Sequence, residues 1–228
     1  MDPNAPPVDP GKVWFIDKPL NWTSFDVVKK LRGCLKIKKI GHAGTLDPLA
    51  TGLLILCSGR KTKEIESYQG MEKEYTGIMR IGQTTPSFDL ETKIDSNVDF
   101  SHVSLSEINE AVDKLTGEIS QIPPAYSAVK VDGKRAYKSA RKGESIELKP
   151  RRVLIKTFNV ETIDLPKVHF RIICSKGTYI RSIARDFGEH LDVGAHLIQL
   201  RRERIGPYHV DEAETLENII ADENLSRY

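Results

Sequence analysis

The sequence predicts an α+β fold with a mixed, mostly antiparallel central sheet flanked by helices and loops. First, β-rich and helical segments mix without the regular strand–helix–strand alternation of a doubly wound fold. Second, two long β-rich runs, 153–163 and 168–174, are separated only by a short turn at 164–166. Third, 12 prolines and 16 glycines indicate many turns, and 228 residues suffice for one large core or two small ones.

The first half of the chain contains a predicted helix with a clear start. Thr23 or Ser24 caps it, and Phe25, Val28 and Leu31 are expected on its buried face. The apolar run 53–57 is bounded by glycine on one side and Ser-Gly on the other, which predicts a short buried strand. The other elements of this half are predicted at 13–16 (strand), 60–68 (helix) and 74–81 (strand).

The second half begins with a long polar loop at 83–103, a length that is typical of functional segments. Ser104 and Glu107 then have the spacing of a capping box for a helix that reaches Leu115. Asp132-Gly133 indicates a tight hairpin after 129–131. The remaining predicted elements are a basic helix at 135–142, a helix at 178–190, a short strand within 195–205 and a final helical turn or two at 215–220.

The chain is expected to form three regions: a loose, proline-rich N-terminal arm at 1–11, a single domain at 12–210, and a short acidic C-terminal tail at 211–228. The N-terminus lacks the basic and apolar regions of a signal peptide. No window approaches 18 consecutive apolar residues, so no membrane span is expected.

Charge is segregated along the chain although the net charge is only +2. Residues 130–152 carry nine lysines or arginines against three acids, whereas 211–223 carry six acids and no Lys or Arg. A second basic cluster lies at 29–39 and a third at 201–204. Such segregation favours a basic face that binds nucleic acid, with a merely solvated face as the alternative.

Cysteine and histidine patterns point away from metals and disulfides. Cys34, Cys57 and Cys174 are far apart, and no Cys-x-x-Cys occurs. This usage fits a reducing cytoplasm, and the histidines lack metal-ligand spacing. We therefore expect no metal site and a cytoplasmic protein.

The segment from Gly41 to Gly52 is the most informative one. Three glycines and a proline in twelve residues make a tightly shaped loop around a single carboxylate, Asp47. Pro48 restricts the backbone of Asp47 further. A catalytic nucleophile needs such constraint, since misplacing it by about 1 Å can cost roughly a hundredfold in rate. A loop-capping aspartate is the alternative.

This loop resembles the signature of the TruB family of pseudouridine synthases. Further segments resemble that family in the same order, at 17–24, 73–75 with 81–82, 122–128 with 133–137, 174–181, and 200–202. The resemblance covers about 12–208. Asn21 stands where many members have glycine, and Asn tolerates the left-handed conformation better than most residues. The C-terminal RNA-binding (PUA) domain that many members carry is not expected here.

The resemblance implies isomerisation of uridine 55 in the T-loop of tRNA to pseudouridine, with no cofactor. It assigns the nucleophile or base to Asp47, base stacking or proton abstraction to Tyr75, and a charge that keeps Asp47 ionised to Arg181. Desolvation would otherwise raise the pKa of the carboxyl group, and arginine keeps its charge when buried. A core tyrosine and a surface arginine are the alternatives.

The remaining expected site residues bind substrate. His42 resembles the histidine that fills the space left by the flipped uridine, Tyr179 and Leu200 resemble pocket-wall residues, and Lys18 resembles a support for the floor of the site. Each of these also has a structural alternative. The candidate phosphate contacts are Lys130, Lys134, Arg135, Arg141, Arg151 and Arg152.

The expected partner is the T-arm of tRNA, with no membrane, no obligate protein partner and a monomeric state. Two alternative functions remain. One is a tRNA-binding folding chaperone whose catalysis is dispensable, and the other is the catalytic subunit of an RNA-guided pseudouridylation complex. A phosphate-binding loop enzyme is disfavoured because the loop lacks the Gly-Lys-Ser/Thr ending.

Overall fold

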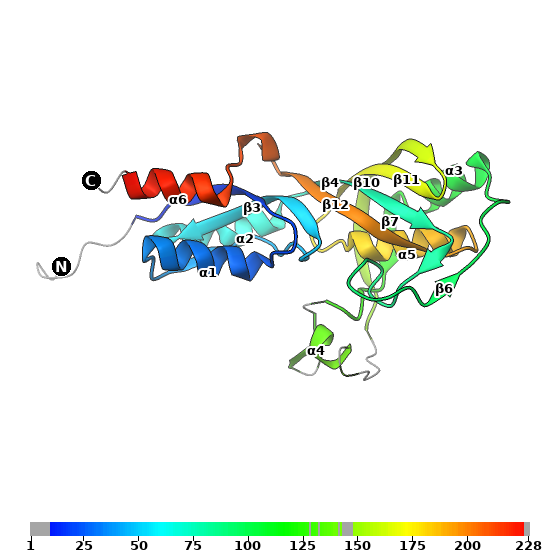
Figure 1. The fold of residues 1–228 in the computed structure, drawn as a ribbon, viewed down its shortest axis with the longest axis horizontal. Coiled ribbons are helices and arrows are strands. Elements are labelled where there is room, and N and C mark those ends of the chain that lie inside the picture. The colour runs from blue at the N-terminus through cyan, green and yellow to red at the C-terminus, as the bar shows by residue number, and fades with distance from the viewer. Residues whose placement is uncertain (1–9, 128, 132, 141, 143–147, 226–228) are drawn as a thin grey trace, which may run out of the picture. The chain divides into compact units, whose positions relative to one another are not determined.

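A computed structural model describes residues 10–127, 129–131, 133–140, 142 and 148–225 (Figure 1). The chain divides into two compact units, one formed by 1–73 with 201–228 and the other by 74–200. Each unit is α+β, as predicted. No helix among the described residues has the length and apolar character needed to cross a membrane.

The sheet of the first unit is built around strand β3 (Ala50–Ser58). Strands β1 (Val13–Lys18) and β2 (Ile40–His42) both pair with β3 in antiparallel fashion. The strand order continues from β3 to β12 (Ala195–Ile205), whose residues 201–205 belong to this unit. The short strand β13 (Tyr208–His209) pairs with the end of β12.

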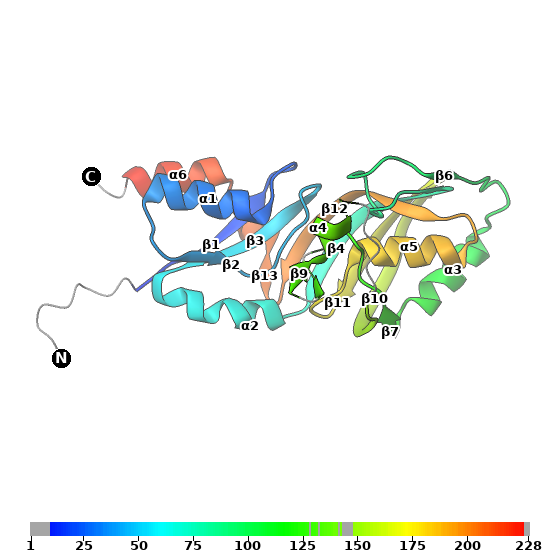
Figure 2. The same cartoon turned by 90° about the horizontal axis from the view of Figure 1, so that it is seen from below.

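Helices cover both faces of this sheet. On one face lie α1 (Ser24–Leu35) and α6 (Leu216–Leu225), side by side in Figures 1 and 2. The opposite face packs against α2 (Ile65–Gly70), which follows the 3₁₀ helix η1 (Gly59–Glu64). Leu54 and Leu56 of β3 belong to the first core, and Leu53, Ile55 and Cys57 to the second. A strand covered on both faces is continuously apolar, which explains the run at 53–57.

Two expectations for this unit need correction. Phe25 was expected on the buried face of α1 but is 59% exposed, and Val27 is buried instead. The final helical turn or two expected at 215–220 prove to be the longer helix α6, which follows the 3₁₀ helix η2 (Val210–Glu212). Leu216 and Ile219 of α6 are buried against α1 and β1. The apolar residues that anchor α6 are too few to stand out in an acidic sequence.

The second unit contains the strand order β12-β4-β11-β10-β7. The bounds of these strands are β4 (Lys73–Ile81), β7 (Gly117–Gln121), β10 (Arg151–Asp164) and β11 (Lys167–Cys174). Strands β10 and β11 form the predicted antiparallel hairpin, and β7 pairs antiparallel with the start of β10. The expected polar loop contains a small pair, β5 (Gln83–Thr84) with β6 (Ser96–Asn97).

Helix α5 (Ile180–His190) runs along one face of this sheet (Figure 2). Its Phe187 contacts Phe158 of β10, which in turn packs edge-on against Phe170 of β11. Helix α3 (Leu105–Lys114) begins at the predicted capping box of Ser104 and Glu107. A small hairpin, β8 (Lys130–Val131) with β9 (Lys134–Arg135), precedes the short helix α4 (Ala136–Ala140).

Candidate active site

Asp47 lies in a loop that closes the β2–β3 hairpin. His42 pairs with Leu56 across the hairpin, and the Ala43 amide donates to the Ile55 carbonyl at 2.8 Å. Gly44 and Gly52 adopt φ values of +102° and +100°, so the loop uses backbone conformations that side chains rarely allow. The resulting loop holds Asp47 half-buried.

The first turn of α1 and the segment before it fix this loop from outside. The Ser24 hydroxyl accepts a hydrogen bond from the Leu46 amide at 2.8 Å and donates to the Leu46 carbonyl at 3.2 Å. The Asn21 amide donates to the Pro48 carbonyl at 2.9 Å, and the φ of Asn21 is +65°. Asn21 therefore takes the left-handed conformation that the sequence predicted for it.

Lys18, at the end of β1, is fully buried beside the loop. Its ammonium group donates to the carbonyls of Trp22 at 2.6 Å, Pro19 at 2.9 Å and Pro48 at 3.5 Å. Burial lowers the pKa of Lys18 to about 8, and the negative charge of Asp47 opposes this shift. Lys18 thus donates to the loop backbone and provides a positive charge near Asp47, and its role as a support for the floor of the site stays a prediction.

Arg202 is a second buried cation in this unit, and sequence reasoning did not select it. It is 1% exposed, and its guanidinium donates to the carbonyls of Leu53 at 2.7 Å, Gly44 at 3.3 Å and Thr45 at 3.5 Å. A Cβ atom at Gly52 would lie 2.3 Å from the Arg202 carbonyl oxygen, so glycine permits this close approach. The available signal was an arginine in the inward-facing register of β12.

His42 is half-buried at the end of β2. Burial lowers its pKa, a backbone hydrogen bond at Gly44 opposes the shift, and the charge of Arg202 adds to it. At neutral pH the ring is therefore favoured in its neutral form. A neutral ring is suited to stacking on nucleobases, in line with the role that the resemblance gives it.

In the second unit, Arg181 is held in the first turn of α5 and is 3% exposed. Its guanidinium donates to the carbonyls of Tyr126 at 2.8 Å and Ser87 at 3.2 Å. The Asp89 carboxylate lies 3.6 Å from its Nε atom and is itself buried. Arg181 is therefore a buried charge, not a surface arginine, and its action on Asp47 stays a prediction. Asp89 was missed because it sits in a polar loop with no distinguishing motif.

The other expected pocket residues of this unit are also largely buried. Tyr75, on β4, is 8% exposed, and Leu200, on β12, is 9% exposed. Tyr179 precedes α5 and is half-buried. These positions fit both a pocket wall and a structural core, so their roles stay predictions.

The predicted phosphate contacts differ in their surroundings. Arg152 is exposed, whereas Arg151 stacks over the Tyr179 ring, with its guanidinium carbon 4.3 Å from the ring centroid, and donates to the Gly177 carbonyl. Arg141 lies outside the described residues. The backbones of Lys130, Lys134 and Arg135 form the β8–β9 hairpin.

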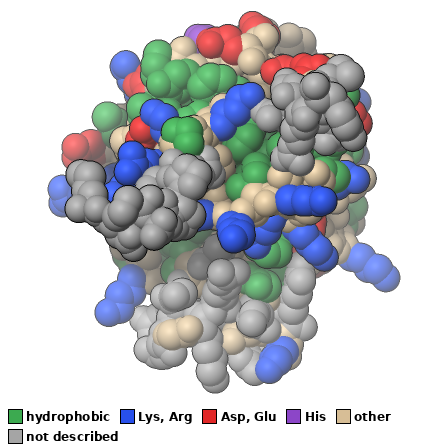
Figure 3. Space-filling model, turned by 90° about the vertical axis from the view of Figure 1, so that its left-hand side faces the viewer, with side chains coloured by type: hydrophobic (Ala, Val, Ile, Leu, Met, Phe, Trp, Pro, Cys, Tyr) green, Lys and Arg blue, Asp and Glu red, His purple; other side chains and the backbone are tan. Residues whose placement is uncertain are grey.

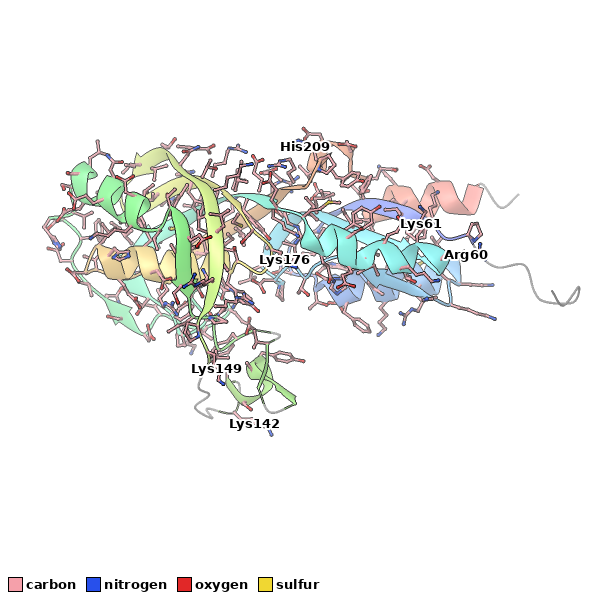
Figure 4. The ribbon with its side chains drawn as sticks, turned by 180° about the vertical axis from the view of Figure 1, so that it is seen from behind. Arg60, Lys61, Lys142, Lys149, Lys176 and His209 are labelled. Carbon is pink, nitrogen blue, oxygen red and sulfur yellow. The ribbon has the colours of Figure 1, made fainter. Side chains whose placement is uncertain are left out.

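Exposed cations occur in both units. In the first unit Lys29, Lys30, Arg32, Lys36, Lys38 and Lys39 are all exposed, and several Lys and Arg side chains show on the face in Figure 3. In the second unit, Lys149 and Lys176 are exposed (Figure 4). Over the described ranges, no three His, Cys, Asp or Glu residues come together to hold a metal ion.

Comparisons with known proteins identify the family to which the sequence is similar. Residues 32–180 match the model of the TruB family pseudouridylate synthase N-terminal domain, and 181–227 match the tRNA pseudouridylate synthase B C-terminal domain. The chain is 53% identical over 210 residues to the tRNA pseudouridine synthase B of Flavobacterium johnsoniae, covering 89% of this chain and 92% of the relative. It is 49% identical to the protein of the same name from Chloroherpeton thalassium, covering 92% and 89%.

Solved structures with the same fold come from multi-component complexes. A Cbf5-Nop10-Gar1 complex matches with a TM-score of 0.72 and 31% identity, covering 92% of this chain and 53% of that chain. An H/ACA RNP bound to a substrate RNA containing 2′-deoxyuridine matches with a TM-score of 0.69 and 28% identity, covering 92% and 52%. The chain thus spans about half the length of these solved chains.

The fold is that of a pseudouridylate synthase, and the matched family model spans the loop that carries Asp47. The chain belongs to the TruB family.

Proposed function

We propose that this protein isomerises uridine 55 in the T-loop of tRNA to pseudouridine. The observation that carries the proposal is the Asp47 loop, whose backbone is fixed by Ser24, Lys18 and Arg202. Two relatives that share about half of their residues with this chain are named tRNA pseudouridine synthase B, which supports tRNA as the substrate. The reaction leaves the oxidation state unchanged, so it requires no cofactor.

The reaction breaks the N1–C1′ bond of uridine, turns the base, and joins C5 to C1′. C5 then loses its proton, and N1 gains one. Asp47 acts at the sugar, either as the nucleophile at C1′ or as the base of a glycal route. Tyr75 stacks on the target base and is the alternative to Asp47 as the base that removes the C2′ proton in the glycal route. That proton returns to C2′ when C5 joins C1′.

The charge of Asp47 must persist when substrate covers the loop and excludes water. Desolvation favours the protonated carboxyl group, whereas nearby positive charge favours the carboxylate. We assign this task to Arg181, as the resemblance implies, and add the buried charges of Lys18 and Arg202. An arginine is well suited because it does not lose its proton when buried.

The target uridine lies in a folded loop and must leave the stack before it can react. His42 then occupies the vacated space, and Tyr179 and Leu200 line the pocket. Exposed cations such as Arg152 contact phosphates and supply salt-dependent affinity without sequence information. We further propose that the protein acts as a monomer in the cytoplasm, without an obligate protein partner.

Two alternatives remain open to test. A tRNA-folding activity could accompany catalysis, and an Asp47→Asn variant that still promotes tRNA folding would demonstrate it. The other alternative is the catalytic subunit of an RNA-guided complex, and one solved structure with this fold is an H/ACA RNP bound to a substrate RNA. This alternative is disfavoured because the relatives near 50% identity, which match over most of their length, carry the tRNA synthase name.

The deciding experiment incubates the protein with an unmodified tRNA transcript and maps pseudouridine by carbodiimide-dependent stops in primer extension. We expect one stop, at position 55, and none with Asp47→Asn. A stop at another position would refute the site specificity. No stop with a folded protein that binds the transcript would favour the chaperone alternative.

A further inference from the structure

Gln121 and Arg151 face each other at the adjoining ends of β7 and β10, and both bind the segment just before α5. They are paired in the register of the two antiparallel strands. Gln121 contacts the backbone of Tyr179, and Arg151 contacts its ring and the Gly177 carbonyl. Two side chains that are adjacent in the sheet therefore converge on one residue.

Gln121 fixes the backbone of Tyr179 from both sides. Its side-chain oxygen accepts from the Tyr179 amide at 2.8 Å, and its side-chain nitrogen donates to the Tyr179 carbonyl at 3.1 Å. The Gln121 side chain is fully buried, and a primary amide offers a donor and an acceptor side by side. Tyr179 is the N-cap of α5 and makes no capping bond of its own, so Gln121 supports the start of the helix.

The residues after Gln121 hold the first turn of α5 at two more points. The Ile122 carbonyl accepts from the Ser182 hydroxyl at 2.8 Å, and the Tyr126 carbonyl accepts from Arg181 at 2.8 Å. The segment 121–126 thus binds Tyr179, Arg181 and Ser182 in turn. Any shift of Tyr179 would also displace the start of α5, which carries Arg181.

We propose that Gln121 and Arg151 form a clamp of positioning residues that fixes the Tyr179 ring and the start of α5 for catalysis. The inference rests on the proposed function. It replaces the expected role of Arg151 as a phosphate contact, because its guanidinium carbon lies over the Tyr179 ring and one of its donors is bonded to the Gly177 carbonyl. The adjacent Arg152 is exposed and keeps the phosphate role.

The kinetic test compares Arg151→Met, Arg151→Lys and Arg152→Met, with Lys167→Met as the control for loss of an exposed charge from the same sheet. Two quantities are measured: the single-turnover rate at saturating enzyme, and the Kd for unmodified tRNA over a range of salt concentrations. Both Arg151 variants should lower the rate, Arg151→Met by about tenfold or more, with Kd changed less than about twofold. Lys conserves charge but not the planar fork, so it should not rescue the rate.

Arg152→Met should instead raise Kd and reduce the salt slope by about 1, as loss of one phosphate contact predicts. Lys167→Met should leave the rate unchanged. The proposal is overturned if Arg151→Met behaves like Arg152→Met, or if Arg151→Lys restores the full rate.

A second readout needs no activity. Hydrogen exchange at the Tyr179 amide should accelerate at least about tenfold in Gln121→Leu, which removes the acceptor, but not in Gln121→Glu, which keeps it. Unchanged exchange in Gln121→Leu would refute the clamp. If Gln121→Leu does not fold, the Arg151 variants decide. The wild-type protein could prove inactive on tRNA while hydrogen exchange accelerates in Gln121→Leu and not in Gln121→Glu. That outcome would refute the proposed function and leave the geometry of the clamp intact.

Discussion

Arg202→Met should destabilise the protein far more than the same change at its neighbour Arg201. Arg202 is 1% exposed and donates to three carbonyls, the shortest bond being 2.7 Å to Leu53. A hydrogen bond from a charged donor contributes about 1.5–3 kcal/mol, and the two longer bonds contribute less. Because the Leu53 carbonyl stays buried without its donor, we expect a loss of about 3 kcal/mol in the free energy of unfolding.

Arg201 provides a matched control on the opposite face of the same strand. Its guanidinium pairs with Asp17 through bonds of 2.7 and 3.0 Å, but its side chain is 32% exposed. Exposed ion pairs contribute at most about 1 kcal/mol, since water screens them and the side chains lose entropy. Arg201→Met should therefore be mild despite its better bidentate geometry.

Urea unfolding followed by circular dichroism measures both effects. With a slope of about 2.5 kcal/mol/M, Arg202→Met should lower the urea midpoint by about 1.2 M and Arg201→Met by about 0.4 M or less. Arg202→Lys, which keeps the charge but not the fork, should fall between them. Equal midpoints for the Arg201 and Arg202 variants would show that burial of Arg202 does not support the Asp47 loop.

Three other predictions follow from the same contacts. The pKa of Lys18 is about 8 in the folded protein against an ordinary value of 10.5, so between these values the unfolded chain holds more protons. The free energy of unfolding of the wild type should therefore rise with pH relative to that of Lys18→Met, by about 3 kcal/mol between pH 7 and pH 11. Urea titrations in which the stability difference between the two proteins does not change with pH would contradict this. Gly52→Ala should lower the free energy of unfolding by about 2 kcal/mol or more, because φ is +100° and its Cβ would meet the Arg202 backbone. Gly33→Ala, in α1 with open space around it, should instead raise the free energy of unfolding by about 0.5–1 kcal/mol, as measured by thermal unfolding. Tyr75→Phe should retain tRNA affinity in filter binding but slow single turnover if the hydroxyl transfers a proton; an unchanged rate would limit Tyr75 to stacking.

Local sequence signals predicted the elements well where a short-range cause dominates. The helix cap at Thr23, the capping box at Ser104 and the turn at 164–166 lie within a few residues of the structure that they produce. The buried strand β3 was also evident, because a strand with helices on both faces is apolar throughout.

The buried charged residues of the candidate site were harder to predict, since their contacts join distant parts of the chain. Arg202 donates a hydrogen bond to Gly44, and Asp89 lies beside Arg181. Both pairs join residues far apart in the sequence, so no local pattern predicts them. Arg151 was assigned to phosphate because its charge is visible in the sequence, but its contact with the Tyr179 ring is not. Helix α6 was predicted only as a helical turn or two, because Leu216 and Ile219 carry its packing among many acids.

The interrupted course of the first unit has a consequence for biosynthesis. Its chain departs after Lys73 and returns only at Arg201, and the guanidinium that holds Gly44 comes from that returning stretch. A ribosome therefore makes the acid long before it makes the cation that fixes its loop. While the intervening residues are being translated, α1 lacks the packing that α6 later provides. We therefore expect the core of the first unit to close only after α6 has been synthesised.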